Sequence, residues 1–245
     1  MIDVQGWDFS QPCVFLVIYK DDLKGRRKMK KIIDVPYIDQ TQEWPTGCES
    51  VSAVMFLQYL GVDISVNEFI EKYLERKPFT KKDGKTYGPD PRKYFAGSPY
   101  DTESMGCYAP VIEKTLNKVL KAISEGTQSV KESELLTDGC YARNVTGLPM
   151  EELLSEYIDK DMPVVFWACI DLKEAVIGPE WILDETDEIF TWKSNEHCML
   201  LVGYDENYYY FNDPWHNHGM IGYEKELVEK RHKEQYEMAV AVERK

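Results

Sequence analysis

The sequence has no long apolar run near its N-terminus. The longest, from Cys13 to Tyr19, is far shorter than the roughly 20 residues that a membrane-spanning helix requires. Acidic residues precede this run and a basic cluster, Lys24 to Lys31, follows it, which reverses the charge order of a secretory signal. We therefore expect no transmembrane helix and no cleavable signal peptide, and from these features a cytoplasmic protein.

Glycine, proline and excess positive charge are also scarce. The 245 residues include 15 Gly and 12 Pro, while 43% are hydrophobic and 13% aromatic, a composition typical of an ordered globular protein and not of a disordered or collagen-like chain. Lys plus Arg number 29 against 43 for Asp plus Glu, a formal net charge of −14. Because this charge repels polyphosphate backbones, nucleic acid and anionic membranes are disfavoured as partners.

No metal-binding or disulfide pattern is present among the six cysteines. None has C-x-x-C spacing, and Cys169 and Cys198 lie in apolar runs, so we expect reduced, mostly structural thiols and neither a disulfide framework nor structural zinc. His216 and His218 form an H-x-H pair without a third spaced ligand. We therefore expect no metal and no cofactor.

No internal repeat, Gly/Ser linker or Pro-rich linker divides the chain. We interpret residues 34–245 as one domain. Residues 1–33 form an N-terminal extension in this interpretation, with one strand and a basic connector.

Four helices are predicted in the first two thirds of the chain. The segment from Cys48 to Leu60 is apolar around most of a helical circumference and stops before Gly61, which indicates a buried central helix. A capping box, Ser65-Val66-Asn67-Glu68, begins the second helix. Pro110 and Pro149 begin the third and fourth.

Strand patterns dominate the last third of the chain. A short apolar run from Pro163 to Ile170 predicts a buried strand. Further strands are expected at 189–192, 198–204, 208–212 and 237–242, the two middle ones joined by a tight turn at Asp205-Glu206-Asn207. Helices followed by an antiparallel sheet predict an α+β fold, with the chemistry where the two layers meet.

Cys48 lies at the first turn of the expected central helix, directly after Pro45-Thr46-Gly47. The unpaired N–H groups and the positive end of the helix dipole favour a thiolate there. The simpler alternative is a buried cysteine acting as a small hydrophobic residue.

Only four histidines could serve as the base for a thiol nucleophile. His197 begins an expected core strand, and Asp213 ends the next one. Two antiparallel strands joined by a tight turn bring these positions together. A carboxylate there would orient the imidazole and stabilise its cation, although a strand-end histidine and an Asp-Pro turn are common without chemistry.

These residues together resemble a known family, the C39-like cysteine peptidases of the papain-like superfamily. The resemblance covers residues 34 to about 242 and rests on Cys48 in PTGCES, His197 in EHCMLLVGYD and Asp213 in FNDPW, together with the block FAGSPYD. Gln42 stands six positions before Cys48, as a glutamine does before the nucleophile in papain-like enzymes.

The resemblance implies a papain-like fold, with the nucleophile helix packed on a C-terminal antiparallel sheet. It also implies that Cys48 attacks a carbonyl, that His197 carries the proton, and that Asp213 orients His197. Gln42 and the Cys48 backbone N–H would bind the oxyanion. Gln40 remains an alternative to Gln42, and FAGSPYD is best interpreted as a structured turn beside the cleft.

The implied partner is a peptide or protein substrate, and the implied reaction is hydrolysis of a peptide or isopeptide bond. Two alternatives stay open: an acyltransferase or amidase that acts on a small amide, and a catalytically silent binding module. Relatives are often exported by bacteria, so the resemblance leaves export open beside the cytoplasmic expectation. Substrate sequence and oligomeric state do not follow from these residues.

Overall fold

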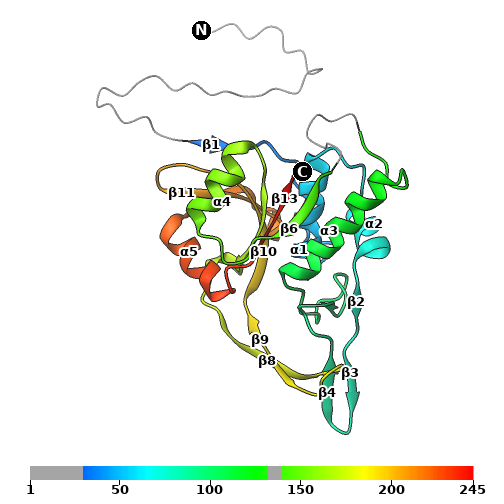
Figure 1. The fold of residues 1–245 in the computed structure, drawn as a ribbon. Helices are drawn as coiled ribbons and strands as arrows, with labels where there is room; N and C mark the ends of the chain where they lie inside the picture. The colour runs from blue at the N-terminus through cyan, green and yellow to red at the C-terminus, as the bar shows by residue number, and fades with distance from the viewer. Residues whose placement is uncertain (1–29, 132–138, 245) are drawn as a thin grey trace, which may run out of the picture.

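The structure is a computed structural model that describes residues 30–131 and 139–244 (Figure 1). The strand expected in the N-terminal extension therefore lies outside the described residues. The main element is a seven-stranded sheet in which β12, β11, β10, β7, β13 and β6 are neighbours in that order and β1 also pairs with β10. All its pairs are antiparallel. Its strands are β1 (Lys31–Ile32), β6 (Tyr141–Asn144), β7 (Val164–Cys169), β10 (Glu196–Tyr204), β11 (Tyr208–Asp213), β12 (Gly219–Glu224) and β13 (Ala239–Glu243).

Helices pack against both faces of this sheet. The α-helices are α1 (Cys48–Tyr59), α2 (Val66–Glu68), α3 (Ala109–Ser124), α4 (Met150–Glu156) and α5 (Lys225–Glu234). A π-helical turn, Phe69–Tyr73, continues α2, and 3-10 turns occur at Ile158–Lys160, Ile170–Leu172 and Trp215–Asn217. The first four helices confirm the sequence prediction, although the second has only three α-helical residues before its π turn.

α1 is the buried central helix that its apolar circumference predicts. Every residue from Cys48 to Leu57 is buried. The helix ends at Tyr59, and Gly61 follows two positions later with a φ of 92°, the left-handed conformation that glycine adopts without strain. The N-cap half of the predicted capping box is confirmed as well, because Oγ of Ser65 accepts a hydrogen bond of 3.1 Å from the Glu68 N–H.

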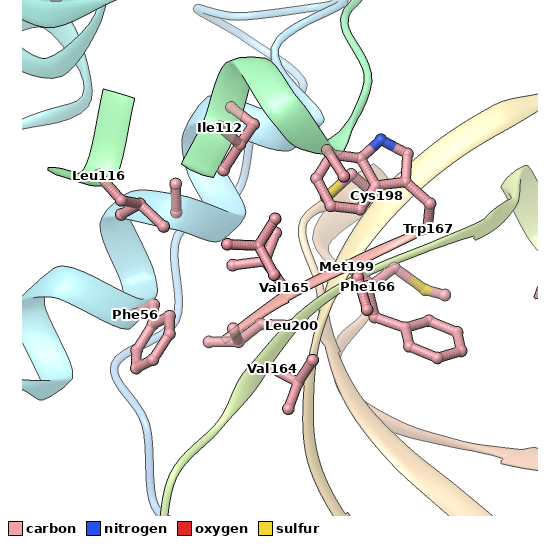
Figure 2. Packing of buried hydrophobic residues seen from close by; sticks show 14 of the residues in the cluster. Phe56, Ile112, Leu116, Val164, Val165, Phe166, Trp167, Cys198, Met199 and Leu200 are labelled. Carbon is pink, nitrogen blue, oxygen red and sulfur yellow. The ribbon is translucent and has the colours of Figure 1, made fainter. Parts of the chain in front are cut away.

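The core fills both faces of the main sheet. α1 packs against β10 and β7, and α3 packs against β6 and β13. Figure 2 shows Phe56 of α1 and Leu116 of α3 near Val165 of β7 and Leu200 of β10, which are directly paired across the sheet. On the other face, Phe166 stacks on His232 of α5 with ring centroids 3.9 Å apart. β7 and β10 are therefore buried on both sides, which holds the start of β10 rigid.

Two smaller sheets were not predicted as sheets from the sequence, although one of them contains the strand expected at 189–192. One joins β2 (Arg76–Lys77) and β5 (Phe95–Ala96), and the other joins β3 (Thr80–Lys82), β4 (Lys85–Gly88), β8 (Val176–Leu183) and β9 (Ile189–Ser194). In Figure 1 the four-stranded sheet projects away from the main sheet as a long arm. Helices and antiparallel sheets are mixed as the α+β prediction requires. The expected order of all helices before all strands is wrong, because β2 to β5 precede α3, β6 precedes α4, and α5 follows β12.

β1 bears on the predicted domain boundary. Lys31 pairs with Tyr204 and Ile32 with Gly203, so these residues are hydrogen-bonded to the main sheet. The division between residues 33 and 34 stays a prediction. Within residues 30–131 and 139–244, no helix has both the length and the apolar character needed to cross a membrane.

Candidate active site

Cys48 is the first residue of α1, where the sequence predicted it. The preceding segment bends sharply: Gly47 donates its N–H to the Trp44 carbonyl at 2.8 Å, and a side chain at Gly47 would lie 2.8 Å from Cβ of Trp44. One turn further along α1, Oγ of Ser52 donates to the Cys198 carbonyl at 3.2 Å. The helix start is therefore fixed against the first residues of β10.

His197 and Asp213 form a buried pair. Nε2 of His197 lies 2.7 Å from Oδ1 of Asp213, and the two side chains are 2% and 1% exposed. They lie at the start of β10 and the end of β11, as the expected hairpin requires. Because Nε2 faces the carboxylate, Nδ1 is the ring nitrogen left to accept a proton.

Asp213 receives three further polar contacts. Its Oδ1 accepts the Trp215 N–H at 3.1 Å, and its Oδ2 accepts the hydroxyl of Tyr223 at 2.7 Å. Nδ1 of His218 lies 3.0 Å from the same Oδ2. Burial by itself would raise the pKa of Asp213, but His197, His218 and Tyr223 lower it well below its ordinary value. The carboxylate is therefore ionised and fixed in position.

The two candidate glutamines lie in different environments. Gln42 is exposed in the turn formed by residues 41–43, which disfavours its predicted role. Gln40 is 2% exposed. Its N–H donates to the Pro214 carbonyl at 2.9 Å, next to Asp213, and its Nε2 donates to the Pro45 carbonyl at 3.2 Å. Gln40 thus bridges the Asp213 segment and the loop that leads into Cys48.

The block FAGSPYD supports that same loop. Oγ1 of Thr46 donates to the carbonyls of Asp101 at 2.8 Å and Ser98 at 3.2 Å. A surface cavity of about 440 Å³ lies beside the block, lined by Arg76, Pro78, Phe79, Gly97, Ser98, Asp101, Glu103 and Ser104. Its lining contains neither Cys48 nor His197.

The Cys48 thiol differs from the expected thiolate. Burial raises its pKa well above the ordinary value, Glu49 and Glu196 raise it further, and the Cys198 backbone N–H lowers it. Among the hydrogen bonds of the described residues, Sγ donates to Oε2 of Glu49 at 3.4 Å and makes none to His197. The helix dipole is outweighed here, because burial and two carboxyl groups act on the same sulfur.

Glu49 and Glu196 are the site residues that the sequence analysis missed. The only signal was adjacency, since Glu49 follows Cys48 and Glu196 precedes His197. One ligand-capable atom from each of Cys48, Glu49 and Glu196 lies within 4.8 Å of the others. The pKa values of all three groups are raised, so a metal ion would have to displace their protons in order to bind at this position.

The other three histidines do not join Cys48. His218 contacts Asp213, and His216 has a φ of 46° with its ring against Trp215. His232 is buried in α5, where burial lowers its pKa to about 4. The H-x-H pair is thus divided, because one of its rings is taken by Asp213.

Comparison with known proteins agrees with the fold. A model described as the peptidase C39-like family matches residues 32–241. The chain is 25% identical over 205 residues to the uncharacterized protein YvpB of Bacillus subtilis (strain 168), covering 80% of this chain and 68% of that protein. A crystal structure of a Bacillus anthracis protein ascribed to the C39-like peptidases superposes with a TM-score of 0.72 at 23% identity, covering 89% of this chain and 98% of the other.

Proposed function

The chain belongs to the C39-like peptidase family, and from this premise we propose that it is a cysteine peptidase that hydrolyses peptide or isopeptide bonds. Cys48 is the nucleophile, His197 the base and Asp213 the group that orients the base. The observation that carries the proposal is the buried His197–Asp213 pair at 2.7 Å, on the strand against which the start of α1 is fixed. A nucleophile, a base and an orienting carboxylate are the three parts that acyl transfer by a thiol needs.

The mechanism follows from which atoms remain available. Nδ1 of His197 takes the thiol proton as Sγ of Cys48 attacks the substrate carbonyl, and it returns that proton to the leaving amine. Water then cleaves the acyl-enzyme, with His197 again acting as base. Asp213 stays ionised throughout and stabilises the imidazolium by its 2.7 Å contact with Nε2.

For the oxyanion we propose Gln40 in place of Gln42. Gln40 is buried and lies between Pro214 and Pro45, whereas Gln42 is exposed. Nε2 of Gln40 donates to the carbonyls of Trp44 and Pro45, so it must exchange one of these hydrogen bonds for the oxyanion. The backbone N–H of Cys48 at the start of α1 is the second donor. Donors fixed before the reaction stabilise charge that develops in the transition state.

The same proposal includes a papain-like arrangement. Its support is the nucleophile at the first turn of a buried helix and the His197–Asp213 hairpin in an antiparallel sheet. α1 and α3 pack against the main sheet. We expect an extended peptide to bind where these two layers meet.

A catalytically silent binding module is the second candidate. Two observations favour it: the pKa of the Cys48 thiol is raised, and the thiol donates its hydrogen bond to Glu49. A buried thiol of this kind reacts slowly. In this case the His197–Asp213 pair would be a structural hydrogen bond.

Incubation of the protein with a mixed peptide library, followed by mass spectrometry, separates the two candidates. A peptidase gives fragments that are absent with Cys48→Ala, and a competing amine reveals any acyl transfer as amide products. A wild-type protein that yields no more fragments or amides than Cys48→Ala would exclude catalysis on these peptides and favour the binding module.

A further inference from the structure

Two carboxyl groups meet at the nucleophile from different elements. Glu49 comes from α1 and Glu196 from the start of β10. Oε2 of Glu49 lies 3.4 Å from Sγ of Cys48, and the three residues bring one polar atom each within 4.8 Å of the others. Both carboxyl groups therefore act on the reacting sulfur directly and on each other.

Backbone geometry makes room for this pair. Gly106 has a φ of 123°, and a side chain there would lie 2.5 Å from Oε1 of Glu49 and 3.3 Å from Oε2 of Glu196. The next residue, Cys107, donates its N–H to Oε1 of Glu49 at 2.5 Å. Oε1 of Glu196 is buried and has no hydrogen-bond partner among the described residues.

No cation balances the pair. Among the ion pairs of residues 30–131 and 139–244, none joins a lysine or arginine to Glu49 or Glu196. The titratable groups that act on the pair or are acted on by it are Cys48 of α1, Cys107 and Tyr108 before α3, Cys169 of β7, and His197 and Cys198 of β10. Of these, only His197 carries positive charge, and then only when protonated.

Two carboxylates so close in a buried place cannot both be ionised at low cost. Burial raises the pKa of Glu49 to about 7, against the lowering effect of the Cys107 N–H. Burial and the neighbouring Glu49 raise the pKa of Glu196 well above its ordinary value. The pair therefore holds at least one proton below neutral pH.

We propose that Glu49 and Glu196 form a proton-sharing pair that sets the protonation state of Cys48, permitting the thiolate while the pair is protonated and holding Cys48 as a thiol once it is ionised. This inference rests on the proposed role of Cys48 as nucleophile. Glu49 touches the reacting sulfur and acts on it directly. Glu196 acts through Glu49 and by its own charge, and is a positioning residue in this sense.

The transfer of the thiol proton decides whether ionisation of the pair suppresses or favours the reactive form of Cys48. Attack requires the thiol proton to pass from Sγ of Cys48 to Nδ1 of His197, which leaves a thiolate and an imidazolium. An ionised Glu49 repels the thiolate at 3.4 Å and attracts the imidazolium, but both carboxyl groups raise the pKa of the thiol. The nearer repulsion is therefore the larger effect, and ionisation of the pair suppresses the reactive form.

The test is the pH dependence of alkylation at Cys48 in the whole chain. Iodoacetamide labelling between about pH 5 and 11 is quantified at the Cys48 peptide by mass spectrometry, so the other cysteines do not interfere, and the window includes the raised midpoint of the Cys48 thiol. Glu49→Gln keeps the shape and the acceptor for the Cys107 N–H while removing the charge. Glu43→Gln, five positions before Cys48 and exposed, is the matched control.

We expect the midpoint of the alkylation profile to fall by about one pH unit or more in Glu49→Gln and by a smaller step in Glu196→Gln, with no change in Glu43→Gln. The alkaline limb of peptide hydrolysis should move to higher pH in the same variants. If the carboxylates acted mainly by stabilising the His197 cation, that limb would move to lower pH. Unchanged or raised midpoints in both variants would overturn the proposal.

Two further observations test the inference, one if the Glu49→Gln variant does not fold and one if no hydrolysis is found. If Glu49→Gln does not fold, the wild-type protein still shows an infrared band of a protonated carboxyl group that disappears near pH 7, and its absence at pH 6 overturns the proposal. Alkylation needs no substrate, so a lowered midpoint without any hydrolysis would support the pair and reject the peptidase. Hydrolysis by the wild-type protein together with unshifted alkylation midpoints in the variants would support the peptidase and reject the proton-sharing pair.

Discussion

Two buried acidic regions flank His197, and they hold their charge differently. On one side, Asp213 is ionised: His197, Tyr223, His218 and the Trp215 N–H all lie within 3.1 Å of its oxygens. On the other side, Glu49 accepts the Cys107 N–H and the Cys48 thiol, and burial raises its pKa to about 7. Both regions are removed from water, yet their pKa values move in opposite directions.

The difference shows that hydrogen-bond donors, and not burial alone, decide the charge of an internal carboxyl group. Asp213 is supplied with donors and a potential cation, so it can stabilise the imidazolium of His197. Glu49 and Glu196 lack a cationic partner among the described residues. They therefore serve as proton holders beside the sulfur.

Removing the nucleophile between the two regions is the most severe change. We expect Cys48→Ala to lower hydrolysis by about 10⁴-fold or more, because neither acidic region can act without the thiol. The substitution removes only one sulfur atom from the core, so the fold should remain intact. Turnover at matched thermal stability checks this, and appreciable residual hydrolysis would disprove the mechanism.

Neutralising the Asp213 carboxylate should have the next largest effect on hydrolysis. Asp213→Asn removes the charge that orients His197 and stabilises its cation, and we expect kcat to fall by up to about 10⁴-fold, the size found for the corresponding substitution in serine proteases. Asp184→Asn, in an exposed turn, is the control. Comparable kcat values for the two variants would show that Asp213 is only structural.

Removing the proposed oxyanion donor, Gln40, should have a smaller effect. Loss of one such donor lowers kcat by about 10²- to 10³-fold, and we expect this for Gln40→Ala. Gln42→Ala should leave kcat within a factor of about two, because its side chain is exposed. The reverse ranking would return the role to Gln42.

The protonated region should also affect stability. The folded protein keeps a proton on Glu49 that the unfolded chain releases above pH 4.5, so this group lowers the free energy of unfolding as pH rises from 4.5 to about 7. The Glu49→Gln variant has no carboxyl group at this position, so its free energy of unfolding does not fall in this way. Its stability relative to wild type should increase across that window by roughly 1–3 kcal/mol and then level off.

Denaturant titrations at several pH values measure this difference, with Glu43→Gln as reference. The contribution of His232, whose pKa is lowered to about 4, is common to all three proteins and cancels. A difference that stays constant with pH would mean that Glu49 is not protonated in the folded state.

Much of this fold could be predicted because its buried elements have clear patterns. The residues of α1 are apolar nearly all round, and β7 is an unbroken apolar run. α5 was missed because its charged surface hides only two buried residues, Val228 and His232. Of the strands of the arm only β9 was expected, at 189–192, and the others were missed for a similar reason, since Thr80–Lys82 is exposed throughout.

The site was predictable only as far as topology determines it. Strand order brings His197 and Asp213 together, and helix position places Cys48. The choice between Gln40 and Gln42 depends on which side chain a turn buries, which sequence spacing does not reveal. Glu49 and Glu196 gave no signal beyond their adjacency to Cys48 and His197, because their pKa values depend on contacts between elements that are distant in the sequence.

The most direct test of the account is hydrolysis by one metal-free sample divided between complete alkylation of Cys48 and treatment with EDTA. The proposed thiol mechanism predicts that alkylation abolishes hydrolysis and that EDTA leaves it unchanged, since no step uses a metal. Hydrolysis that survives alkylation of Cys48 and is lost in EDTA would contradict the assignment of Cys48 as the nucleophile.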